Sequence, residues 1–127
     1  MKLARIVNAT DPNLTGFKAH SGKLILYHGW SDAAIPAQNT IDYYQSVLKK
    51  MGSRKTREFV RLFMVPGMQH CGGGAGPNSF GQWSVARADP EHDIAAALER
   101  WVEQGIAPER IIAAKHSNAM DPASAVE

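Results

Sequence analysis

An aspartate and a histidine each follow an apolar segment of the chain, and both are residue types that move protons. Asp32 comes after the apolar residues of "LILYHGWSD", and His70 comes after those of "FVRLFMVPGMQH". A carboxylate that accepts a hydrogen bond from an imidazole fixes its tautomer and stabilises the imidazolium, so that the other ring nitrogen can deprotonate a nucleophile. We therefore predict that Asp32 and His70 are the acid and the base of a catalytic triad.

Two predicted strands would position these side chains. Residues 23–27 and 59–65 are almost continuously apolar, which is typical of short strands covered on both faces. Between them, apolar side chains recur at three- and four-residue spacing and predict a helix over 37–51, with Gly52 as its C-terminal cap. The positions that define this apolar face are Ile41, Tyr44, Val47, Leu48 and Met51.

The second half of the chain predicts a long loop and another helix. Residues 66–88 contain six of the eleven glycines, and a loop of this length in a small domain is often functional. Asp89 and Pro90 fit a helix start, and Gly105 fits its end. The predicted buried face consists of Ile94, Ala97, Leu98, Trp101 and Val102. Residues 111–115 are a candidate final strand, and we expect 116–127 to be a frayed tail.

The order strand, helix, strand, helix predicts an α/β fold with parallel strands. Sites in open α/β sheets lie beyond the carboxyl ends of the strands, where both Asp32 and His70 fall. The order Asp before His also matches the last two members of the α/β-hydrolase triad, Ser, Asp and His. Because two or three strands make an incomplete sheet, we expect residues 1–127 to be part of a larger α/β domain.

Other interpretations of these residues stay open at this point. An aspartate after a strand is often a turn former, and Cys71 could be an inert small apolar residue. We interpret His28 as a turn residue whose ring caps backbone groups, and the three tryptophans as packing residues. A metal site is a further alternative, ranked low because no ligands have the paired spacing of a structural zinc site. Its candidate ligands are His28, Asp32, His70, Cys71 and His92.

Composition argues against several classes of function. A net charge of +2 is too small to indicate nucleic-acid binding. The sequence has no apolar run of about 18 residues, so we expect no membrane partner, and its first residues lack the apolar core of a signal peptide. A single cysteine excludes a disulfide within the chain.

Three segments together resemble the tannase and feruloyl esterase family, which includes hydrolases of mono(hydroxyethyl) terephthalate. They are "GKLILYHGWSDAAIPAQNTIDYY", "FMVPGMQHCGGGAGPNSF" and "ALERWVEQGIAPERIIAAK". The resemblance implies an α/β-hydrolase fold and hydrolysis of feruloyl- or galloyl-type aromatic esters. It implies that Asp32 is the triad acid and His70 the general base. It also implies that Cys71 is half of a disulfide to a cysteine outside this chain, beside the nucleophilic serine.

The sequence departs from the family pattern at the nucleophile. The family's Cys-Ser-x-Gly-Gly segment does not occur, and no serine lies in a Gly-x-Ser-x-Gly elbow. The lid and its calcium site are missing too, so we expect no cofactor in this chain. We therefore expect a C-terminal fragment that is inactive alone, from a family whose disulfide suggests a secreted or periplasmic protein. The alternative is a non-catalytic module that forms homo-oligomers through exposed strand edges.

Overall fold

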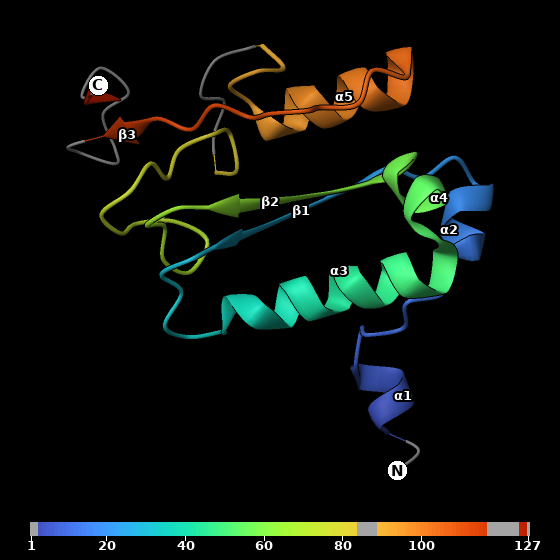
Figure 1. Cartoon of the computed structure of the whole chain (residues 1–127). Coiled ribbons are helices and arrows are strands. Elements are labelled where there is room, and N and C mark those ends of the chain that lie inside the picture. The colour runs from blue at the N-terminus through green and yellow to red at the C-terminus, as the bar shows by residue number, and fades with distance from the viewer. Residues whose placement is uncertain (1–2, 84–88, 117–124, 127) are drawn as a thin grey trace.

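The structure, a computed structural model, describes residues 3–83, 89–116 and 125–126. Its elements follow one another along the chain in the colours of Figure 1. They are α1 (Ala4–Val7), α2 (Thr15–Ala19), β1 (Leu24–Gly29), α3 (Ala37–Met51), α4 (Ser53–Arg57), β2 (Val60–Val65), α5 (Ile94–Gln104), β3 (Lys115–His116) and β4 (Ala125–Val126). No helix among these residues is long and apolar enough to cross a membrane.

The central sheet has two parallel strands, as the sequence predicts. β1 pairs with β2 from Leu24 opposite Val60 to Gly29 opposite Val65. The helix α3 connects the two strands, and its bounds match the predicted helix 37–51. Figure 1 shows α3 on one side of the strands and α5 on the other. Both strands run in the same direction, so the segments that carry Asp32 and His70 leave the sheet at the same end.

The helix α5 packs through a narrower face than the sequence predicts. Trp101 is 2% exposed. The guanidinium carbon of Arg61 lies 5.0 Å from the centroid of its ring, and the ammonium nitrogen of Lys23 lies 5.4 Å from it. Such cation–π contacts let charged side chains cover a buried aromatic ring. Val102, which the periodicity assigns to the same face, is exposed, because consecutive residues of a helix point about 100° apart and the buried face is too narrow to include both.

The start of α5 also differs from the prediction. The N-cap is Asp93, whose Oδ1 accepts hydrogen bonds from the amides of Ala95 and Ala96. Asp89 instead caps a preceding turn, where its carboxylate accepts from the amides of Glu91 and His92. Both aspartates have side chains suited to capping, and the apolar residues that begin at Ile94 decide where the helix starts.

The C-terminal strand is shorter than predicted and lies further along the chain. Of the segment 111–115, Lys115 belongs to β3, and Ala114 forms an isolated bridge with Ser79. β3 pairs antiparallel with β4, and His116 and residues 125–126 belong to the segment 116–127 for which the sequence predicts a frayed tail. Residues 117–124 and 127 of that tail lie outside the described part of the chain, as do 84–88 of the predicted loop.

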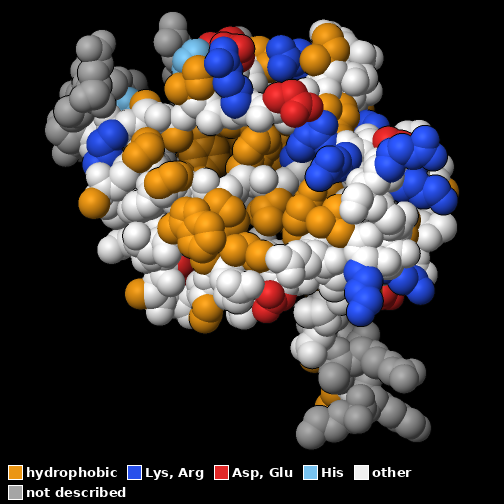
Figure 2. Space-filling view, viewed as in Figure 1, with side chains coloured by type: hydrophobic (Ala, Val, Ile, Leu, Met, Phe, Trp, Pro, Cys, Tyr) orange, Lys and Arg blue, Asp and Glu red, His pale blue; other side chains and the backbone are white. Residues whose placement is uncertain are grey.

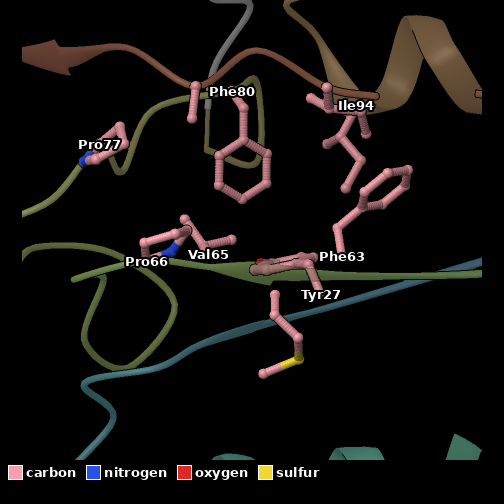
Figure 3. Close-up of a pocket in the computed structure, with 10 residues that line it drawn as sticks. Tyr27, Phe63, Val65, Pro66, Pro77, Phe80 and Ile94 are labelled. Carbon is pink, nitrogen blue, oxygen red and sulfur yellow. The ribbon is translucent and has the colours of Figure 1, made fainter. Parts of the chain in front are cut away.

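Apolar side chains surround a cavity of about 180 Å³ between the sheet and the segments that flank α5. Figure 3 shows Phe80 and Ile94 pointing toward Tyr27 and Phe63 on the strands. The rings of Tyr27 and Phe80 meet edge to face, with centroids 5.1 Å apart. Figure 2 shows apolar side chains at the surface between α3 and α5, so this small sheet leaves part of its apolar surface uncovered.

Candidate active site

Asp32 and His70 meet beyond the carboxyl ends of β1 and β2. Asp32 Oδ2 lies 2.8 Å from His70 Nδ1, which is hydrogen-bonding distance. The parallel strands cause this meeting, because they bring together two residues that are 38 positions apart in the chain. The carboxylate can only accept, so His70 Nδ1 carries the shared proton. Among the described residues, no group pairs with His70 Nε2, which leaves that nitrogen available to accept a proton.

The turn after β1 holds the Asp32 carboxylate tightly. Its Oδ1 accepts hydrogen bonds from the amides of Ala34 at 2.8 Å and Ile35 at 2.9 Å, and the side chain is 3% exposed. The pKa of Asp32 is lowered to about 2: the hydrogen bond from the Ile35 amide contributes most, those from His70 and the Ala34 amide contribute less, and burial opposes them. Asp32 is therefore an acceptor-only carboxylate over the whole physiological range.

The ring of His28 packs against the same turn. Its Nε2 lies 3.0 Å from the Ile35 carbonyl oxygen and 3.2 Å from Asp32 Oδ2, and its Nδ1 lies 2.7 Å from the Thr40 hydroxyl. The prediction that His28 is a turn residue is wrong, because it lies in β1, but its contact with the Ile35 carbonyl confirms that the ring caps a backbone group. Its contact with Asp32 is not predicted from the sequence. A four-residue spacing is a weak signal, because the chain leaves the strand and turns between the two residues.

The loop that carries His70 is held mainly through its backbone. The amide of Ser31 donates to the Met68 carbonyl at 2.9 Å, and the amide of Gly76 donates to the Gly67 carbonyl at 3.2 Å. A Cβ atom on Gly29 would lie 2.3 Å from the Met68 carbonyl oxygen, so the two loops touch where a side chain would not fit. His70 itself is 52% exposed.

Cys71 follows the histidine in a left-handed conformation, with φ of 58°. The side chain is half-buried and neighbours the Tyr27 side chain. Burial raises the pKa of Tyr27, and the neighbouring Cys71 raises it further. The indole of Trp83 donates to the Cys71 carbonyl at 3.0 Å.

Two of the three tryptophans are not the packing residues that we expected. Trp30 is 53% exposed and Trp83 is 75% exposed, whereas Trp101 is buried. Trp30 lies in the turn beyond β1, and Trp83 is anchored through its ring nitrogen to the loop of His70. The sequence alone does not separate them, because a tryptophan is the same large apolar residue whether it packs inward or lies at the surface.

The candidate metal ligands do not assemble as one group. His92 pairs with Asp89, at 2.7 Å between Nδ1 and Oδ1. Within the described ranges 3–83, 89–116 and 125–126, no three His, Cys, Asp or Glu side chains are grouped so that they could hold a metal ion.

A carboxylate bound to one nitrogen of an imidazole whose other nitrogen is open is an arrangement that can transfer a proton. A family model described as tannase and feruloyl esterase matches residues 1–126. The chain belongs to the tannase and feruloyl esterase family. It is 46% identical to an uncharacterized esterase from Xanthomonas campestris, over 98% of this chain and 24% of that protein. It is 39% identical to a probable feruloyl esterase B-2 from Aspergillus terreus, over 95% of this chain and 23% of that protein.

Solved structures agree with this family assignment. An esterase from Aspergillus oryzae superposes with a TM-score of 0.79 at 37% identity, over 85% of this chain and 22% of that one. Feruloyl esterase B from the same organism superposes with a TM-score of 0.77 at 31% identity, over 87% of this chain and 23% of that one. The chain thus spans less than a quarter of the length of these family members.

Proposed function

We propose that this chain supplies the acid and the base of a serine carboxylic-ester hydrolase. In this proposal Asp32 orients and stabilises the His70 imidazole, and His70 Nε2 takes the proton from a serine hydroxyl as it attacks the ester carbonyl. The same nitrogen then returns the proton to the leaving alcohol, and a second cycle with water releases the acid. The observation that carries the proposal is the 2.8 Å contact between His70 Nδ1 and Asp32 Oδ2 at the ends of parallel strands.

The rest of the proposed site would come from outside these residues. No serine of the sequence lies in a nucleophile elbow, and Asp32 and His70 lie in the chain order of the last two triad members. We propose that the chain forms the C-terminal part of an α/β-hydrolase sheet and that the serine and the oxyanion-hole donors belong to the missing part. Cys71 would form a disulfide with a cysteine beside that serine and tie the base to the nucleophile.

The proposed substrates are aromatic esters of the feruloyl or galloyl type. Relatives named as feruloyl esterases support this class. The proposed reaction requires no cofactor from this chain. Without a nucleophile the isolated chain should have negligible activity, because a serine-protease triad loses about 10⁶-fold in rate when its serine is removed.

The test places this chain in a complete enzyme. The matching 24% of the Xanthomonas esterase is replaced by residues 1–127, and hydrolysis of methyl ferulate and of an aryl acetate is measured for the chimera and for the chain alone. We expect an active chimera and an inactive isolated chain. By analogy with serine proteases, His70→Ala should lower kcat by about 10⁶-fold and Asp32→Ala by roughly 10⁴-fold.

The pair of Asp89 and His92 is a matched control. These side chains have the same residue types and a similar contact distance, but they lie in the turn that precedes α5. Asp89→Ala and His92→Ala should leave kcat of the chimera within about threefold, because structural substitutions do not remove a transition-state interaction. An active chimera that tolerates loss of Asp32 or His70 would contradict the proposal, as would an isolated chain whose activity depends on both.

The uncovered apolar surface favours a second candidate function, a self-associating module without activity. In the described residues, β1 and β2 form a sheet of two strands, and Ile35, Ile106 and Ile112 are among the exposed apolar side chains. Exposed apolar surface and strand edges promote association. Size-exclusion chromatography with light scattering, with and without reductant, tests it. A monomer at all concentrations excludes the module, and a dimer that reductant dissociates identifies a Cys71–Cys71 bridge.

A further inference from the structure

The His28 ring is the most completely engaged side chain near Asp32 that the proposed mechanism leaves unused. It is 11% exposed, against 52% for His70. One nitrogen contacts the Ile35 carbonyl and Asp32 Oδ2, and the other contacts the Thr40 hydroxyl. The ring thus joins the end of β1, the turn that holds the carboxylate, and the first turn of α3. Both nitrogens of this mostly buried ring have polar partners, as buried polar atoms require.

The surroundings of the ring select one neutral tautomer. Nε2 faces two oxygens that cannot donate: the Ile35 carbonyl at 3.0 Å and the ionised Asp32 carboxylate at 3.2 Å. Nε2 must therefore carry a proton. In the neutral ring Nδ1 is then an acceptor, and the Thr40 hydroxyl is positioned to donate to it at 2.7 Å. Both ends of the ring favour the same tautomer, so it presents a fixed positive dipole end to Asp32.

We propose that His28 is a positioning residue for Asp32, an inference that rests on the proposed function. Its Nε2–H donates to the Ile35 carbonyl and so fixes the turn whose Ala34 and Ile35 amides hold Asp32 Oδ1. The same N–H lies beside Oδ2, the oxygen that meets His70. The Asp32 carboxylate therefore has a hydrogen-bond donor at or beside each oxygen, which favours the orientation that faces His70. Groups that orient the partner of a functional imidazole act in this way in many sites.

The test reads the tautomer of His70, which a merely structural effect on folding would not change. Long-range ¹H–¹⁵N correlation spectra distinguish Nδ1–H from Nε2–H in a neutral imidazole. In the parent chain His70 should be the Nδ1–H tautomer, because that proton lies between Nδ1 and Asp32 Oδ2. Asp32→Asn should remove this preference. A His70 tautomer that does not respond to Asp32→Asn refutes the proposed triad itself, separately from the role of His28.

Two substitutions of His28 form a matched pair. The amide nitrogen of glutamine occupies roughly the place of Nε2, and that of asparagine occupies the place of Nδ1. We expect His28→Gln to retain the Nδ1–H tautomer of His70 and His28→Asn to lose it. Suppose that Asp32→Asn acts as stated but that His28→Gln loses the Nδ1–H tautomer or His28→Asn retains it. The role of His28 is then refuted while the triad stands. Backbone amide spectra of each variant establish that it is folded.

A milder variant keeps the inference testable if His28→Asn does not fold. Thr40→Val is nearly isosteric and removes the hydroxyl that donates to Nδ1. His28 should keep its Nε2–H tautomer, which the Ile35 carbonyl and the Asp32 carboxylate select, but its ring loses its contact with α3, so His70 should show a mixture of both tautomers. A folded Thr40→Val variant in which the tautomer of His70 is unchanged would overturn the proposal. Thr15→Val, a hydroxyl in α2 far along the chain from this site, is the control that should leave both rings as in the parent.

Discussion

The turn that carries Asp32 and the loop that carries His70 are built in different ways. The turn is self-contained: two amides and a histidine from adjoining segments surround a carboxylate that is 3% exposed. The loop has backbone contacts and leaves a histidine that is 52% exposed. Asp32 is therefore fixed by residues close to it in sequence, whereas His70 has one polar partner among the described residues and an open side. In the proposed enzyme, that open side is where the nucleophile would arrive.

The largest expected effect on the free energy of unfolding comes from Gly74, in the loop that carries His70. Gly74 has φ of 87°, and a Cβ there would lie 2.1 Å from the Gly67 carbonyl oxygen. Gly74→Ala should lower the free energy of unfolding by roughly 1–3 kcal/mol, because it adds both a clash and backbone strain. Urea denaturation measures it. Gly16→Ala is the control, since a Cβ meets nothing within 4 Å there. Equal effects of the two substitutions would mean that the loop is not held by close backbone contacts.

A smaller effect is expected at the N-cap of α5. Asp93→Ala removes the acceptor for the Ala95 and Ala96 amides and should cost about 1 kcal/mol of unfolding free energy. Asp93→Asn keeps a capping oxygen and should cost less. Thermal or urea unfolding ranks the two variants. If both variants lose the same amount, the cap is not what Asp93 contributes, and α5 is held mainly by Trp101.

The pKa of Asp32 tests whether the turn alone holds the acid. Carboxyl ¹³C shifts should titrate with a pKa of about 2, against an ordinary value of 3.8. Because folding lowers this pKa, the charged form contributes stability that is complete above about pH 4 and is lost as the pH falls through about 2. His70→Ala should raise the pKa only part of the way, since the Ile35 amide contributes most. A full return to 3.8 would show that the base, not the turn, holds the acid.

The smallest effect on the free energy of unfolding is expected for an exposed ion pair. Glu91 and Arg110 meet at 3.1 Å with side chains 49% and 69% exposed. Glu91→Gln should change the free energy of unfolding by less than about 1 kcal/mol, because solvent screens such pairs. Urea denaturation at low and high salt measures it. A larger loss of unfolding free energy would mean that this exposed ion pair is not screened by solvent as we expect.

Sequence patterns predicted the regular elements better than the loops. The apolar periodicity located α3 and both strands of the parallel pair within two residues. It failed at the start of α5, where Asp89 and Asp93 offered the same capping chemistry, and at Val102, where period alone could not set the width of the buried face. The short helices α1, α2 and α4 were not predicted, because a single turn gives too few positions for a periodic signal.

The sequence by itself determined which residues can transfer protons and on which strand ends they lie. Asp32 and His70 followed from residue type and from the apolar segments before them, and family membership is borne out by the match to residues 1–126. The tertiary structure decided the surroundings of the acid. That His28 and Thr40 reach the Asp32 turn depends on how α3 packs back against β1. No local pattern encodes such a contact, because side-chain distances across elements are set by packing rather than by spacing along the chain.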